Sequence, residues 1–129
     1  MHKSRLAGFI IDCQTDDLEA ATRFWSAALG LKVSVAAPAE VKYRTLATAA
    51  DELHLEVQQV EHASRVHLDI EADDIEAEVR RLENLGARRI GPVESWYVMQ
   101  APTGQRFCVV GVVRADFAAR ANTWNDCSP

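Results

Sequence analysis

Polar residues with chemical potential alternate with apolar residues in several short segments of this sequence. His54 and Glu56 interrupt one apolar series, and His67 and Asp69 interrupt another. This alternation predicts strands with one apolar face and one polar face. Over the whole chain, the polar faces collect seven residues: Asp12, His54, Glu56, His67, Asp69, Arg106 and Cys108. Burying so many unpaired charges costs several kcal/mol each, so this face must be solvated, internally paired or in contact with a ligand.

We predict three of these residues, His67, Asp12 and Asp69, to be catalytic. An imidazole titrates near neutral pH and can act as a general base, a metal ligand or a hydrogen-bond donor to a substrate. A structural role for His67, held by Asp69 or Asp12, fits the pattern equally well. The two aspartates could share a proton and do acid–base work. The alternative, which we favour, is that each binds a loop amide or pairs with Arg106.

A second set of residues is predicted to contact the substrate: His54, Glu56, Trp96, Arg106 and Cys108. Trp96 follows a Gly-Pro turn and could stack on a planar ligand. Arg106 could bind a carboxylate on the ligand in bidentate fashion, or pair with an internal aspartate. Cys108 could be a nucleophile, but no neighbouring base supports that role, and a partly buried core thiol is the favoured interpretation.

An internal repeat predicts how these residues are positioned. Residues 11–20 resemble residues 68–77, with five identities: Asp12/Asp69, Asp16/Asp73, Asp17/Asp74, Glu19/Glu76 and Ala20/Ala77. A sixth, Arg23/Arg80, follows at the same offset. The repeat spans about half the chain and indicates two copies of one supersecondary unit. Asp16 and Asp73 are expected to cap the helices, with a glutamate three residues later completing a capping box. Gly30 and Gly86 are expected to end those helices in the left-handed conformation.

Each copy reads as a strand, a helix and three further strands. In the first copy the expected strands are 9–13, 31–35, 41–48 and 53–60, and in the second they are 66–70, 88–90, 96–100 and 106–113. The apolar faces of these strands are expected to pack on the two helices. The tail from Ala115 carries no periodic signal, and its last residues are expected to fray.

The amino-acid composition argues against several classes of partner and function. The 129 residues suit a single domain, and 14 Lys and Arg against 19 Asp and Glu give a formal charge of −5. Nucleic acids and anionic membranes are therefore expected to be excluded as partners. Three cysteines without CxxC spacing predict free thiols in a reducing compartment. The N-terminal apolar run is too short for a signal peptide or a membrane span, so a cytoplasmic location is expected.

Several motifs in order resemble the vicinal oxygen chelate superfamily, which includes glyoxalase I, bleomycin-resistance proteins and extradiol dioxygenases. They are residues 17–30 (DLEAATRFWSAALG), 65–70 (RVHLDI), 78–87 (EVRRLENLGA) and 102–110 (PTGQRFCVV), and the likeness is strongest to a glyoxalase-like branch. The resemblance implies an α+β fold in which two βαβββ modules form a curved mixed sheet around a concave cavity, with the helices on the outer face. It implies one domain over residues 1–129, with modules at about 7–60 and 66–113, a tail at 115–129, and a homodimer.

The resemblance also bears on metal binding. Metal-dependent members place His, Glu, His and Glu on the concave face, and His67 matches the third position. The first position falls on Phe9 or Ile10, which cannot coordinate, and the last falls on Cys108; His54 or Glu56 lies near the second. We therefore expect no bound metal and a small-molecule binding protein or metal-independent enzyme. The alternatives are a divalent-metal-dependent lyase or dioxygenase using His67 with Glu56 or His54, and a drug-sequestering resistance protein.

Overall fold

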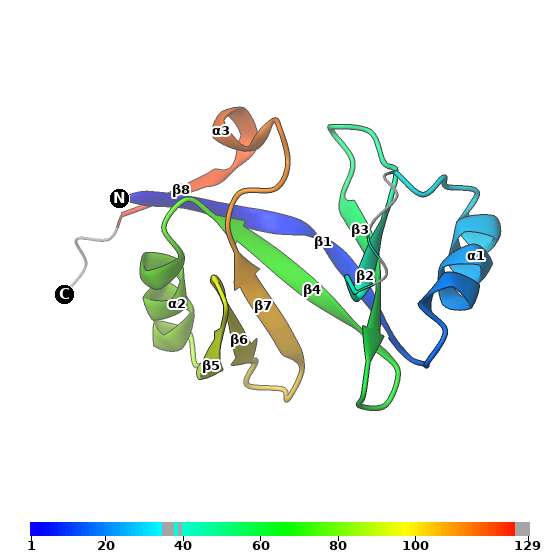
Figure 1. Cartoon of the computed structure of the whole chain (residues 1–129). Helices are drawn as coiled ribbons and strands as arrows, with labels where there is room; N and C mark the ends of the chain where they lie inside the picture. The colour runs from blue at the N-terminus through cyan, green and yellow to red at the C-terminus, as the bar shows by residue number, and fades with distance from the viewer. Residues whose placement is uncertain (35–37, 39, 126–129) are drawn as a thin grey trace. The chain divides into compact units, whose positions relative to one another are not determined.

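The chain forms two compact units, each described here by itself. In the computed structural model, residues 1–34, 38 and 40–125 are described. One unit comprises Gly8–His67, and the other comprises Met1–Ala7 with Leu68–Pro129. Strands β1 (His2–Gln14) and β4 (Arg65–Ala72) contribute residues to both units (Figure 1).

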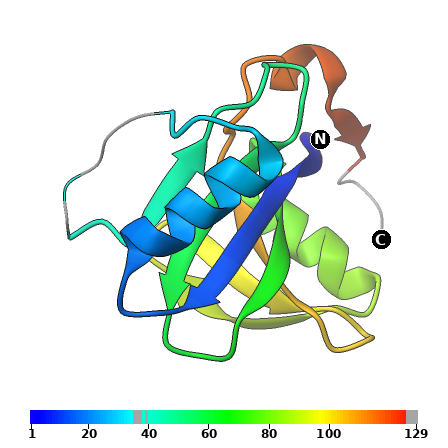
Figure 2. The same ribbon diagram turned by 90° about the vertical axis from the view of Figure 1, so that its right-hand side faces the viewer.

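The Gly8–His67 unit is a three-stranded sheet with one helix on it. The second half of β1 runs parallel to β3 (His54–Val60), and β2 (Tyr43–Leu46) pairs antiparallel with β3. Helix α1 (Leu18–Leu29) lies across one face of this sheet (Figure 2). The core beneath the helix consists of Leu18, Leu46 and Val57, with Cys13, Ala21, Trp25, Leu31 and Leu55 packed around them.

The second unit repeats this construction. Strand β4 runs parallel to β7 (Arg106–Val110). Strand β7 pairs antiparallel with β6 (Trp96–Gln100), which in turn pairs antiparallel with β5 (Arg88–Val93). Helix α2 (Ile75–Asn84) packs against β5, β6 and β7. Its core consists of Ala72, Val79, Leu82, Met99, Phe107 and Val109. In both units a helix follows the first strand, and a later strand, β3 or β7, runs parallel to that first strand.

The predicted α+β fold built from a repeated module is therefore confirmed, with one element weaker than expected. In place of the strand predicted at 31–35, only Val33 makes an isolated bridge, to Leu46. Val35 lies outside the described residues. The predicted burial of Val66 and Leu68 beneath a helix is wrong, because their side chains are 60% and 39% exposed. Helix α2 covers β5, β6 and β7, and along β4 only the later residues Ile70 and Ala72 reach the core.

The helix starts differ by one residue from the prediction. Asp17 and Asp74, not Asp16 and Asp73, are the N-caps, and their carboxylates accept from the backbone N–H of Ala20 and Ala77 at 3.0 Å. The glutamates after them consequently occupy the second helical position, and no capping box forms. Asp73 instead accepts from the backbone N–H of Lys3 at 2.8 Å. Both helix ends are as predicted, since Gly30 and Gly86 have φ values of 69° and 107°.

The tail is more ordered than the sequence indicated. Helix α3 (Phe117–Arg120) is one turn long, and β8 (Asn122–Trp124) pairs antiparallel with the start of β1. Elements this short contain too few residues to show a hydrophobic period. Phe117 is 5% exposed, so the tail contributes to the core of its unit.

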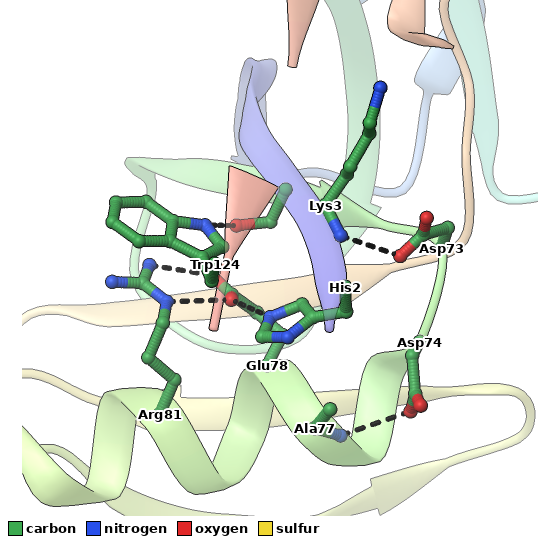
Figure 3. Close-up of polar contacts among 9 residues, drawn as sticks. His2, Lys3, Asp73, Asp74, Ala77, Glu78, Arg81 and Trp124 are labelled. Carbon is green, nitrogen blue, oxygen red and sulfur yellow. Dashed lines mark hydrogen bonds and ion pairs between the residues drawn. The ribbon is translucent and has the colours of Figure 1, made fainter. Parts of the chain in front are cut away.

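A buried charged cluster lies beside the tail (Figure 3). The fully buried Glu78 is bonded by His2 Nε2 at 2.7 Å and by Nε and Nη2 of Arg81 at 2.8 Å each. The Arg81 guanidinium lies 3.9 Å from the ring centroid of Trp124, whose indole N–H donates to Ser4 Oγ at 2.8 Å. Burial alone would raise the pKa of Glu78, but the hydrogen bonds from Arg81, His2 and Ser4 outweigh it and the pKa is lowered.

Candidate functional site

The Gly8–His67 unit contains a histidine–carboxylate pair on the sheet face opposite α1. His67 Nδ1 lies 2.6 Å from Oδ2 of Asp12. The Asp12 side chain is 1% exposed, whereas that of His67 is 12% exposed. Arg65 Nε lies 3.7 Å from the same carboxylate oxygen. The other oxygen, Oδ1, is buried and accepts no hydrogen bond from the described part of the chain.

This geometry determines how the imidazole can work. A carboxylate only accepts hydrogen bonds, so Nδ1 of His67 donates to Asp12, and any proton that the ring exchanges passes through Nε2. The carboxylate holds the ring in this orientation and stabilises the charge it gains on taking up a proton. Of the two partners predicted for His67, Asp12 lies 2.6 Å away and comes from a different strand, β1.

A second pair, from β3, lies on the same face of this unit. His54 Nε2 lies 2.7 Å from Glu56 Oε1, and both side chains are about one fifth exposed, at 18% and 22%. In the parallel register Gly8 lies opposite His54, and Ile10 lies opposite Glu56. Partners in register point to the same side of a sheet, so His54 and Glu56 share the face of Asp12. Four of the predicted site residues are thus brought onto one face of this unit.

The remaining predicted residues belong to the other unit. Asp69 and Cys108 are register partners on β4 and β7, and Cys108 is also the partner of Val98 on β6. Trp96 alternates onto the same face as Val98, opposite Met99 and Tyr97, which contact the α2 core. Trp96, Arg106, Cys108 and Asp69 are all half-buried.

The expected pairing of an aspartate with Arg106 is wrong for Asp12, which pairs with His67 and Arg65. Among the described residues Arg106 makes no ion pair with any carboxylate, Asp69 included. Because Asp12 and Asp69 lie in different units, their proposed proton sharing stays a prediction.

The residues of the Gly8–His67 unit do not suit the alternative metal site at His67 with Glu56 or His54. Within the described residues of this unit, no three His, Cys, Asp or Glu side chains converge closely enough to share an ion. His54 and Glu56 bind each other, His67 binds Asp12, and the first family position falls on the buried Ile10 or on Phe9. A catalytic ion needs several convergent donors, which these residues do not provide.

Sequence reasoning missed two buried glutamates. Glu71 is fully buried and accepts from Arg5 Nε at 2.8 Å and from the backbone N–H groups of Val113 and Arg114 at 2.7 and 2.9 Å. It continues the alternation of His67 and Asp69 along β4, and that signal was available. Glu78 lies on a helix, where the alternation rule does not apply. Both hold the chain's terminal segments to their unit and are structural.

The thiol of Cys13 lies on the helix-covered face of this sheet, away from the two histidine–carboxylate pairs. It packs in the core beneath α1, and burial raises its pKa, with a hydrogen bond to Trp25 lowering it and the charge of Asp12 raising it. A thiol with a raised pKa carries little thiolate, the nucleophilic form.

Comparisons with known proteins agree with this fold. A family model described as a glyoxalase-like domain matches residues 8–110. No curated protein matches the sequence significantly. A hypothetical protein of Bacillus halodurans C-125 superposes with a TM-score of 0.63 at 15% identity, covering 86% of this chain and 96% of its own. Methylmalonyl-CoA epimerase from Mycobacterium tuberculosis superposes with a TM-score of 0.60 at 16% identity, covering 89% of this chain and 91% of its own.

A Streptomyces coelicolor methylmalonyl-CoA epimerase, in complex with 2-nitronate-propionyl-CoA, gives a TM-score of 0.53 at 15% identity, covering 86% of this chain and 97% of its own. At such identities the likeness shows the fold alone. No helix within the described ranges is long and apolar enough to cross a membrane.

Proposed function

This chain belongs to the glyoxalase-like domain family of the vicinal oxygen chelate superfamily, and we propose that it binds a small carbonyl-bearing molecule and transfers a proton on it without a metal. His67 is the acid–base group, and Asp12 positions it. The observation that carries the proposal is the 2.6 Å bond between the half-buried imidazole and the almost fully buried carboxylate.

The stability of the fold does not account for this pair by itself. Asp12 keeps one buried oxygen without a donor from the described residues, and such a group costs about 1–3 kcal/mol. Positions that carry such a cost are concentrated at functional sites. If His67 were purely structural, we would expect both oxygens of its partner Asp12 to accept hydrogen bonds.

The proposed step is reversible removal of a proton from the carbon beside a carbonyl. Nε2 of His67 takes the proton as the C–H bond breaks, and the electron pair moves onto the carbonyl oxygen to give an enolate. Reversal returns a proton to the same carbon. Epimerases among the similar structures act on acyl-CoA substrates by their names, and this supports a carbonyl compound with an acidic C–H bond as the substrate class. His54 and Glu56 are proposed to contact the substrate from the same face.

Hydrogen exchange tests the step without knowledge of the natural substrate. The purified protein is incubated in D₂O with a panel of ketones, 2-hydroxyketones and short acyl thioesters, and loss of the α-proton signal is followed by NMR. We expect wild type to accelerate exchange for at least one compound and His67→Gln to lose about 100-fold or more of that rate. Asp12→Asn keeps the shape and removes the charge, and we expect an intermediate loss.

His62 provides the matched control, because it is an exposed histidine whose Nδ1 lies 2.8 Å from the carbonyl oxygen of the adjacent Ala63. His62→Gln should exchange like wild type. Full activity in His67→Gln would refute the proposal. Loss of wild-type exchange after chelation, restored by a divalent ion, would favour the metal-dependent alternative. Ligand binding without exchange for any compound would favour a sequestering protein.

We also propose that the protein is a cytoplasmic homodimer, with α1 in the interface. Phe24 and Leu29 of α1 are 61% and 46% exposed, and the Phe24 ring lies 5.0 Å from Trp25 in an edge-to-face arrangement. Exposed aromatic residues are enriched at interfaces. Light scattering should give twice the chain mass of 14.3 kDa, and Phe24→Glu should give a monomer. A monomeric wild type at micromolar concentration would contradict this.

A further inference from the structure

The Arg106 side chain differs in its contacts from the other buried or half-buried arginines among the described residues. Five arginines within the described residues are buried or half-buried: Arg5, Arg44, Arg81, Arg106 and Arg114. Arg5, Arg44 and Arg81 bond to carboxylates, and Arg114 donates to a backbone carbonyl. The side chain of Arg106 alone has no hydrogen bond or ion pair with any described residue. Its nitrogens are not among the fully buried unpartnered atoms of the described residues, so its five donors face solvent and can bind an incoming acceptor.

The neighbour that could satisfy Arg106 is already engaged. Gln100 is its register partner on β6, so the two side chains lie on the same face. The amide oxygen of Gln100 accepts from Arg88 Nη2 at 2.8 Å, and its amide nitrogen donates to the carbonyl of Gly104 at 3.2 Å. The Gln100 side chain thus bonds to Arg88 and Gly104 and not to Arg106.

Gln100 also places a second cation beside the first. Arg88 is its partner on β5, and their hydrogen bond shows that Arg88 points to this face. Arg88, Gln100 and Arg106 thus form one row across three adjacent strands of a single unit. Neighbouring strands are about 4.8 Å apart, so the two arginine backbones are about 10 Å apart. Like charges in such a row repel each other unless an anion lies between them.

The surface beside the row is mostly apolar. Val98 and Cys108 form the next row along the same face, with Asp69 as the partner of Cys108 on β4, and Trp96 follows on β6. All four are half-buried. The one carboxylate favours a ligand whose anionic group lies at the arginines and whose body lies over Val98 and Trp96. A molecule with an anionic group at the arginines and an apolar or aromatic body along these side chains would match both features.

We propose that this face of β5, β6 and β7 binds a small organic oxyanion, a carboxylate or phosphate ester with an apolar body, held by Arg106 with Arg88 as a second cation. The site lies within the unit containing Leu68–Pro129 and does not depend on the proton-transfer role of His67. Arg106 offers two parallel N–H donors to an oxyanion, a geometry that lysine cannot reproduce.

Calorimetric titration of the whole chain tests this with four probes: 3-phenylpropionate, phenyl phosphate, inorganic phosphate and the neutral 3-phenylpropanol. We expect at least one aromatic anion to bind and the alcohol to bind about tenfold more weakly or not at all. Arg106→Gln should weaken the anion about tenfold or more, Arg106→Lys should restore part of the loss, and Arg88→Gln should weaken it severalfold. Arg80→Gln is the matched control, an exposed arginine on α2, and should not change binding.

A stability measurement on the same variants separates binding from a structural role. Arg106→Gln removes an unmatched charge, so its melting temperature should equal or exceed that of wild type. Four outcomes would overturn the proposal: no probe binds wild type, the alcohol binds as tightly as the anions, Arg106→Gln binds unchanged, or Arg106→Gln unfolds as readily as Arg81→Gln. Exchange catalysed by His67 is a separate readout, so the two proposals can fail independently.

Discussion

The two units are copies of one module, yet they use the same repeat position differently. Asp12 and Asp69 are equivalent in the repeat, and each lies on a first strand that pairs in parallel with the last strand of its module. Opposite Asp12 in register is Gln58, and opposite Asp69 is Cys108. Asp12 is 2% exposed and bonded to a histidine, whereas Asp69 is half-buried. Duplication thus preserved the backbone pattern while the two polar faces diverged.

The units also differ in where they bury charge. In the Gly8–His67 unit the buried acid lies on the face proposed for chemistry and retains an unmatched oxygen. In the other unit the fully buried Glu71 and Glu78 each bond to several donors from distant parts of the chain. A matched buried carboxylate holds structure together, and a partly matched one marks a candidate site.

The largest stability effect is expected at Glu78. Glu78→Gln keeps the volume and leaves Arg81 and His2 without their buried carboxylate, so we expect a loss of about 3 kcal/mol in the free energy of unfolding. Glu83→Gln is the control, because Glu83 lies on the same helix as Glu78 and pairs at the surface with Arg89 of β5. It should cost far less than Glu78→Gln. Urea unfolding measures both, and equal losses would contradict the distinction between them.

The Glu78 cluster also predicts a pH dependence. The pKa of Glu78 is lowered in the folded state, so its contribution is fully present above the unfolded pKa of about 4.3. That contribution is lost as the pH falls through the folded pKa. The difference in unfolding free energy between wild type and Glu78→Gln should therefore be large at neutral pH and shrink in acid below about pH 4. A difference that grows in acid would reverse the sign of this argument.

How much of this was readable from the sequence depends on the kind of information each feature carries. The repeat and the period-two alternation predicted the modules and the shared polar faces, because both follow from local chain geometry. The pairing of His67 with Asp12 was one of two open choices, since it depends on which strands become neighbours. Glu78 was missed because its partners, His2 among them, lie 76 residues away in the chain, and no local pattern predicts such a contact.

A glycine in β1 offers an intermediate effect confined to the Gly8–His67 unit. A Cβ built on Gly8 would lie 1.8 Å from the backbone oxygen of His54, and backbone atoms cannot move away cheaply. Gly8→Ala should cost about 2–3 kcal/mol and disturb His54 and Glu56. Gly91 in β5 is the matched control, because its Cβ would meet nothing within 4 Å. Gly91→Ala should be neutral or slightly stabilising in thermal unfolding. If Gly8→Ala were as stable as Gly91→Ala, the close approach of His54 to Gly8 would be contradicted.

The smallest effects test whether the two modules remain equivalent at their helix starts. Asp17 and Asp74 make the same 3.0 Å capping bond in α1 and α2, so Asp17→Ala and Asp74→Ala should each lower the free energy of unfolding by about 1 kcal/mol. Asp16 and Asp73 precede them in the repeat but are not equivalent in three dimensions. Asp16→Ala should have almost no effect, whereas Asp73→Ala removes the acceptor for the backbone N–H of Lys3 and should be measurable by urea unfolding. Equal values for Asp16→Ala and Asp73→Ala would mean that the Lys3 contact contributes nothing, and that the two units differ less at this position than their hydrogen bonds indicate.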